Sequence, residues 1–189
     1  MAVKTFTTGE VLTAADTNTY LNNGGLVYVS GATFSNATTV DVTGFTATYS
    51  QFRVIYFLTR HSGSGGSAVS ATYRDASTGY LTGFYGGGVS SNYLGTVAAY
   101  GARNNGADMA MGSVYDANSP NRGWFDVGGM NSTVYRPTLT GSFYDISTSA
   151  NVSLGYEYAG TRTISPDRIR LTCAVGMTGT WQLYGYRTA

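Results

Sequence analysis

Hydrophobic and polar residues alternate along much of the chain after residue 25. In QFRVIYFLTR (51–60), every second residue from Phe52 to Leu58 is apolar, and RIRLTCAVG (168–176) and TWQLYGYR (180–187) repeat the pattern. A period of two places successive side chains on opposite faces of a β-strand. We therefore expect one buried face on each of these strands. The residues predicted to point inward are Phe52, Val54, Tyr56, Leu58, Ile169, Leu171, Cys173, Val175, Trp181, Leu183 and Gly185.

Short runs of this kind recur at intervals of about ten to fifteen residues. The predicted strands span residues 26–29, 38–44, 51–60, 68–76, 79–86, 92–101, 107–116, 122–130, 138–147, 151–159, 168–176 and 180–187. About twelve short antiparallel strands predict an all-β fold, an antiparallel β-sandwich of the jelly-roll type. Two segments have the composition of tight hairpin turns, Gly176-Met177-Thr178-Gly179 and Asn104-Asn105-Gly106.

The first 25 residues follow a different pattern, which predicts one short helix. Thr13 is a suitable N-cap with Asp16 three residues later, and the helix would end near Asn23 with Gly24 as its C′ residue. A helix of roughly ten residues does not persist alone, so it needs a surface to pack on, either the chain's own β body or sister chains or another protein of an assembly. We therefore divide the chain into an N-terminal attachment and assembly segment (1–25) and a β-sandwich head domain (26–189). The apolar face expected to make the assembly contacts consists of Leu12, Ala15, Tyr20 and Leu21.

Composition narrows the functional classes. Of the 189 residues, 42% are hydrophobic and 14% aromatic, which argues against disorder. Charged residues make up only 11% and the formal net charge is +1, with the basic residues scattered singly. This distribution offers no footprint for nucleic acid and no polybasic membrane patch.

The sequence contains neither a pair of cysteines nor a long apolar segment. Cys173 is the single cysteine, so no disulfide forms within the chain, and the alternation predicts a buried, inert thiol. No run of about eighteen apolar residues would insert into a membrane, and the first 25 residues lack the apolar region of a signal peptide. We expect a protein that is made in a cytoplasm.

Catalytic and metal-binding motifs are weak, and we expect no enzyme activity, cofactor or metal site. Asp145 and Glu157 flank one predicted hairpin and are a candidate carboxylate pair for a glycosidase, although nothing marks them. His61 is the only histidine, and no G-x-S-x-G motif accompanies it. Asp116, Asn118 and Asn121 offer oxygen ligands in one loop, but their spacing fits no calcium-loop signature.

The loops instead suit recognition. Tyrosine supplies a large, stiff and amphipathic contact area, while asparagine and serine supply adaptable hydrogen bonds. An aromatic ring stacked on a sugar, with amide and guanidinium groups on its hydroxyls, would bind a glycan. The candidate receptor-binding residues fall in three clusters: Tyr100, Arg103, Asn104 and Asn105; Tyr115, Asn118, Asn121, Arg122 and Trp124; and Asn131 and Tyr135.

Both ends of the chain resemble bacteriophage tail-fibre and minor tail proteins of the receptor-binding type. The resemblance rests on the opening FTTGEVLTAADTNTYLNNGG and on the ending SPDRIRLTCAVGMTGTWQLYGYR, together roughly a quarter of the chain. It implies a homotrimer with an N-terminal virion-anchoring part, a distal β-sandwich head and a role in attachment to the host cell surface. It carries over no receptor-contacting residue.

Three functional hypotheses follow. The first is a trimeric tail-fibre or fibre-tip subunit of the virion tail, made in the host cytoplasm, that contacts tail or baseplate proteins through its N-terminus and binds a host surface glycan or protein. The second is a head-fibre, decoration or connecting tail subunit without a receptor. The third is a small glycan depolymerase.

Overall fold

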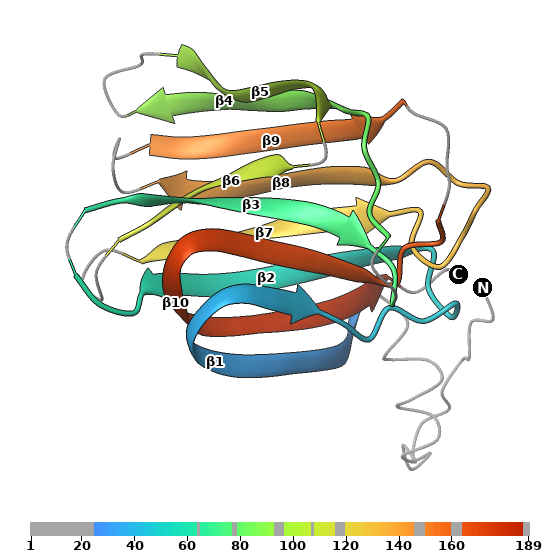
Figure 1. The fold of residues 1–189 in the computed structure, drawn as a ribbon. Helices are drawn as coiled ribbons and strands as arrows, with labels where there is room; N and C mark the ends of the chain where they lie inside the picture. The colour runs from blue at the N-terminus through green and yellow to red at the C-terminus, as the bar shows by residue number, and fades with distance from the viewer. Residues whose placement is uncertain are drawn as a thin grey trace, which may run out of the picture.

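The computed structural model describes residues 25–63, 65–76, 79–92, 97–106, 108–115, 120–145, 150–159 and 164–186. Ten antiparallel strands make up this part of the chain (Figure 1). They are β1 (Leu26–Val42), β2 (Gln51–Arg60), β3 (Ser67–Arg74), β4 (Phe84–Asn92), β5 (Val97–Gly106), β6 (Met109–Val114), β7 (Asn121–Gly128), β8 (Thr138–Asp145), β9 (Ala150–Tyr158) and β10 (Arg168–Tyr186).

The all-β prediction is confirmed for the described residues. The predicted N-terminal helix and its contact residues Leu12, Ala15, Tyr20 and Leu21 lie outside them. Within the same ranges, no helix is long and apolar enough to cross a membrane.

All ten strands belong to one sheet. Nine of them follow the order β5-β4-β9-β8-β7-β2-β10-β3-β6, and β1 pairs with β10. Every pairing is antiparallel.

The long strand β10 turns this sheet over on itself. Its first part, Arg168 to Cys173, pairs with β3, whereas Met177 to Gly185 pair with β2. β1 follows β10 around the same bend, which Figure 1 shows as two curved ribbons, and its register shifts at three points. β6 consequently contacts β2, β7 and β8. The result is a nearly closed, barrel-like sheet.

The predicted hairpin at Gly176-Met177-Thr178-Gly179 is wrong. These residues continue β10, and Met177 to Gly179 pair with Arg60 to Leu58 of β2. Glycine at position 179 does not serve a turn. It allows a close approach of two strands, because a Cβ there would collide with the carbonyl oxygen of Phe57. The predicted strands 26–29 and 38–44 are likewise one strand, β1.

The second predicted hairpin turn is also wrong. Asn104, Asn105 and Gly106 lie within β5, where Arg103 is opposite Gly86 and Gly106 is opposite Phe84. Pairing with β4 therefore holds the Asn-Gly sequence in extended backbone.

The core lies on the inner side of the folded sheet. The inward positions predicted for β2 and β10 are confirmed as buried, except Val175, which is partly buried against the core. Cys173 is buried as expected. Aromatic rings fill much of the space, and those of Tyr73 and Phe84 stack with centres 5.2 Å apart. With this side committed to packing, the opposite side of the same strands faces solvent.

Candidate functional site

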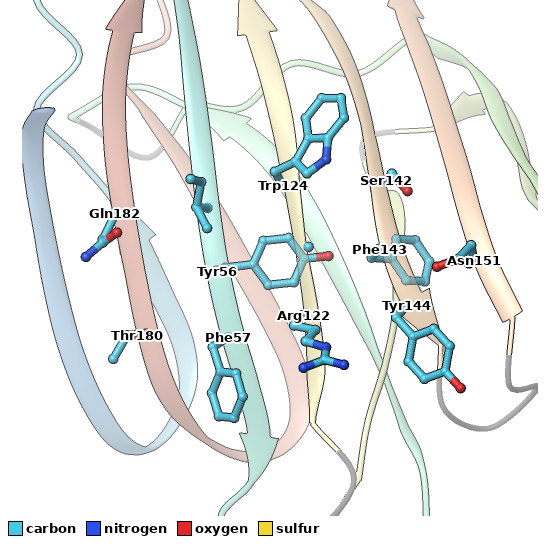
Figure 2. A pocket seen from close by; sticks show the side chains of 12 residues that line it. Tyr56, Phe57, Arg122, Trp124, Ser142, Phe143, Tyr144, Asn151, Thr180 and Gln182 are labelled. Carbon is cyan, nitrogen blue, oxygen red and sulfur yellow. The ribbon is translucent and has the colours of Figure 1, made fainter. Parts of the chain in front are cut away.

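A shallow hollow lies on the solvent-facing side of the sheet, across β10, β2, β7, β8 and β9 (Figure 2). Its volume is about 600 Å³, within the range of roughly 300–1,000 Å³ usual for small-ligand sites. We call it the Trp124 hollow. Its lining consists of Ile55, Tyr56, Phe57, Arg122, Gly123, Trp124, Ser142, Phe143, Tyr144, Asn151, Thr180 and Gln182.

Strand register decides which side chains meet in the hollow. Phe57 of β2 is opposite Arg122 of β7, and Arg122 is opposite Tyr144 of β8. Two residues further along the same strands, Ile55 of β2 is opposite Trp124 of β7. A shift by one residue would exchange every outward side chain for an inward one. The same register that fills the core therefore assembles the hollow.

Large apolar side chains are exposed at its centre. Ile55 is 41% exposed, Phe57 43% and Trp124 37%. Single exposed apolar residues are ordinary on a protein surface, whereas a contiguous group marks an interaction site. These three belong to two neighbouring strands, so they form such a group.

An ionic cluster beside the hollow holds the Trp124 ring. The guanidinium carbon of Arg53 lies 4.1 Å from the centre of that ring. Arg53 Nε and Nη2 donate to the two carboxylate oxygens of Asp126 at 2.7 and 2.8 Å. The Tyr186 hydroxyl lies 2.9 Å from both oxygens and donates to the same carboxylate. Asp126 thus fixes the Arg53 guanidinium through two hydrogen bonds, while the same guanidinium stacks on the Trp124 ring.

The electrostatics of this cluster agree with its geometry. The hydrogen bond to Asp126 raises the pKa of Arg53, and the negative charge of Asp126 acts in the same direction. Burial raises the pKa of the Tyr186 hydroxyl, and its hydrogen bond to Asp126 adds to this effect. Arg53 therefore stays a cation and Tyr186 a neutral donor at physiological pH.

Polar groups surround the apolar centre. Arg122 and the Asn151 and Gln182 amides offer donors, the amides also offer acceptors, and Ser142 and Tyr144 contribute hydroxyls. Figure 2 shows Arg122 and Trp124 together on β7, between Phe57 on one side and Tyr144 on the other. Among the residues that the structure describes, the lining includes no carboxylate, histidine, lysine or cysteine. Its chemistry is that of stacking and hydrogen bonding.

Only part of the second predicted receptor-binding cluster, which includes Asn121, Arg122 and Trp124, lies at the hollow. Arg122 and Trp124 line the hollow, as a binding role requires. Asn121 is completely buried, and its side-chain amide donates to the carbonyl oxygens of Met111 and Ser113, both at 3.1 Å. It therefore serves the fold and lies out of a receptor's reach.

The other members of that cluster lie elsewhere. Tyr115 is partly buried, with its ring over Gly66. Asn118 lies outside the described residues.

The third cluster lies on a separate surface. Asn131 and Tyr135 line a depression of about 350 Å³ between the β7–β8 connection and the β1–β2 connection. Asn131 donates to the carbonyl oxygen of Phe45 at 2.6 Å, and Tyr135 is 71% exposed. The β7–β8 connection follows the far end of β7, away from Arg122. The third cluster therefore does not join the hollow.

The first cluster is placed only by its backbone. Tyr100, Arg103, Asn104 and Asn105 belong to β5, and their side chains lie outside the described part of the structure.

The residues considered for catalysis are dispersed. Asp145 is opposite Ala150 and Glu157 is opposite Thr138, so the two acidic residues occupy opposite ends of the β8–β9 pair. His61 Nδ1 lies 2.9 Å from Thr178 Oγ1, at the bend of β10. Across the described ranges, no three His, Cys, Asp or Glu side chains are grouped to hold a metal ion.

Sequence reasoning missed most of the hollow. Ile55 and Phe57 carried a readable signal, since FRVIYFL is apolar on both faces of a strand whose outer face would normally be polar. Tyr144, Asn151 and Gln182 carried none, because only the pairing of distant strands brings them to this place.

The described features are an exposed apolar group bordered by polar side chains, in a hollow on the outer face of an all-β sheet. No protein-family model matches the chain, and no curated protein matches it.

Proposed function

We propose that this chain is a structural virion protein, a phage tail-fibre or fibre-tip subunit, whose head binds a glycan on the host cell surface. The single observation that carries the binding role is the Trp124 ring. This ring is partly exposed in the hollow, and the guanidinium of Arg53 lies over it. A ring fixed in this way loses little conformational entropy when a ligand settles on it.

Sugar chemistry fits the lining better than other ligand chemistries do. A sugar ring has apolar C–H faces and an edge of hydroxyls, so it requires a flat apolar surface bordered by donors and acceptors. Trp124 and Phe57 supply the surface, and Arg122, Asn151 and Gln182 supply the border. The lining residues offer no acid–base pair, which favours binding over the depolymerase alternative.

The virion context rests on the resemblance at the two ends of the chain. The C-terminal part of that resemblance falls in β10, the strand that pairs with β1, β2 and β3. We infer a jelly-roll sandwich from the two strand groups β1-β10-β3-β6 and β2-β7-β8-β9-β4-β5. We further infer a homotrimer mounted on tail or baseplate proteins through residues 1–25.

Binding to cells tests this function. Fluorescently labelled full-length protein is incubated with a panel of Gram-positive and Gram-negative bacteria and with their isolated surface polysaccharides. We expect saturable binding to some strains, abolished in Trp124→Ala and retained in Tyr135→Ala, which removes an exposed aromatic ring outside the hollow. Absence of binding across the panel, or equal binding by both variants, would refute the assignment.

A second candidate is an assembly role without a receptor, and the exposed Ile55 and Phe57 favour it. Apolar residues at the centre of a sheet face also suit contact with another subunit. If they are subunit contacts, Phe57→Ser lowers the oligomer mass measured by light scattering. If they serve a glycan, the mass is unchanged and cell binding falls.

A further inference from the structure

The Trp124 hollow continues past β10 into a second hollow. This neighbouring depression, about 450 Å³ in volume, is lined by Tyr28, Gly31, Ala32, Thr33, Thr180, Trp181 and Gln182. Thr180 and Gln182 line both depressions. The two hollows therefore adjoin at these residues, and we call them together the groove, which crosses six strands from β9 to β1.

The far end of the groove has an aromatic platform of its own. Tyr28 is 58% exposed, and its ring packs edge-on against Tyr184 with centres 5.7 Å apart. Gly31 contributes no side chain at this end, and a Cβ there would lie 2.8 Å from the carbonyl oxygen of Trp181. The Tyr28 hydroxyl would lie 3.2 Å from the same Cβ, so the missing side chain lets the Tyr28 side chain lie close to the backbone of β1.

A fixed polar group lies between the two platforms. The Tyr184 hydroxyl donates to Gln182 Oε1 at 2.9 Å, which orients the amide and leaves its NH₂ group as a donor. Three strand spacings separate β7, which carries Trp124, from β1, which carries Tyr28. At about 4.8 Å per spacing, the platforms are roughly 14 Å apart across the strands.

We infer that the groove takes a linear glycan of several sugar units, laid across the strands so that it contacts Trp124 and Tyr28 together. This inference rests on the proposed function and adds the form of the ligand. One sugar ring is too short to reach both platforms, whereas an extended chain would cover Trp124, Gln182 and Tyr28 in succession. Affinity should then rise with chain length until both platforms are covered.

The probe is a size-fractionated partial acid hydrolysate of whichever surface polysaccharide the full-length protein binds. Isothermal titration calorimetry measures the affinity, because each of the two tryptophans of the chain lines one of the two hollows and fluorescence alone would not separate them. We expect the dissociation constant to fall by roughly tenfold or more between one- or two-sugar fragments and fragments that span the groove.

Two variants separate the platforms. Tyr28→Ala removes the far platform, and Thr33→Tyr places a bulky β-forming residue in the second hollow, at a position that does not line the Trp124 hollow. Both should reduce long-fragment affinity to the short-fragment level and leave short fragments unaffected. Tyr80→Ala, which removes an exposed tyrosine outside the groove, is the matched control.

The outcomes are distinguishable. Equal affinity for short and long fragments, or long-fragment binding that survives both groove variants in folded protein, would overturn the extended-ligand inference and leave glycan binding intact. Failure of the wild-type protein to bind any surface polysaccharide would overturn the proposed function and this inference with it.

Discussion

Arg170 holds both carboxylate oxygens of Asp41, through Nε and Nη2, each at 2.7 Å. The two residues are opposite each other on β10 and β1. This hydrogen bonding lowers the pKa of Asp41 below its ordinary value of 3.8, against the opposing effect of burial. The Asp41–Arg170 pair therefore stabilises the pairing of β1 with β10 as long as the carboxyl group of Asp41 is ionised.

The stability contributed by Asp41 should depend on pH. Because the folded pKa lies below the unfolded one, the contribution is complete above the unfolded value and disappears as the pH falls through the folded value. We expect Asp41→Asn to lower the free energy of unfolding by about 1–3 kcal/mol at pH 7 and by progressively less below about pH 4.

Urea unfolding at pH 7, 5 and 3 checks this. Glu157→Gln serves as control, since its pairing with Arg136 at 3.9 Å is largely exposed and should contribute little. An Asp41→Asn deficit that stays constant across the three pH values would contradict the linkage.

Arg53→Ala should loosen Trp124 without touching the floor of the hollow. Loss of the stacking cation is expected to increase acrylamide quenching of Trp124 and to weaken glycan binding about 3- to 10-fold. Arg74→Ala is the matched control, because Arg74 lies over the ring of Tyr80 outside the groove. Unchanged quenching in Arg53→Ala would mean that the tryptophan does not depend on this contact.

Substitution by alanine should affect different properties at Asn121 and at Trp124, which are three residues apart. The first change should lower stability, and the second should lower binding. Asn121→Ala leaves the carbonyls of Met111 and Ser113 without this donor and should cost about 1–3 kcal/mol of stability. Trp124→Ala should lower binding and leave the midpoint of thermal unfolding nearly unchanged. Thermal melts and cell binding, measured on the same samples below the melting temperature, compare the two. The reverse pattern would move the site away from Trp124.

Gly179→Ala should destabilise the sheet. The added methyl group would collide with the Phe57 carbonyl oxygen, and displacing backbone typically costs about 1–3 kcal/mol. Gly155→Ala is the control, because nothing lies within 4 Å of a Cβ at that position. Equal unfolding midpoints in urea for the two variants would show that the strands separate without cost.

Removal of residues 1–25 tests the assembly segment. The shortened chain starts at Leu26, the first residue of β1, so every described strand is retained. We expect light scattering to give a mass near three chains for the full-length protein and a lower mass after truncation, with the β-sheet signal in circular dichroism retained. A trimer that survives truncation would place the subunit contacts in the head, and a monomer in both cases would contradict the fibre proposal.

Local pattern located most of the strands, although it divided β1 and β10 and displaced the bounds of β4 and β5. It did not give the pairing partners of the strands. Residues 51–60 were predicted with the bounds that β2 has, because alternation between core and solvent is a property of the strand itself. Gly179 was misread because glycine serves both tight turns and close backbone approach, and only the position of Phe57 separates these uses. Asn105-Gly106 favours a turn, but pairing with β4 holds it extended.

The same limit applied to the site. Arg122 and Trp124 were found because they are close in sequence within a cluster expected in a loop, although the structure places both on β7. Gln182 joins them only through a register between distant segments. A single sequence contains the outward-facing residues but not the order of the strands that carry them.

The position of β10 in the strand order also bears on how the molecule is made. Three strands within the first 74 residues, β1, β2 and β3, pair with a segment that leaves the ribosome only after β1 to β9. Contacts so distant in sequence slow folding, because loop-closure entropy is lost before the pairing compensates for it. The nascent chain therefore carries unpaired strand edges until β10 has emerged, and closure of the sheet becomes a late step of folding.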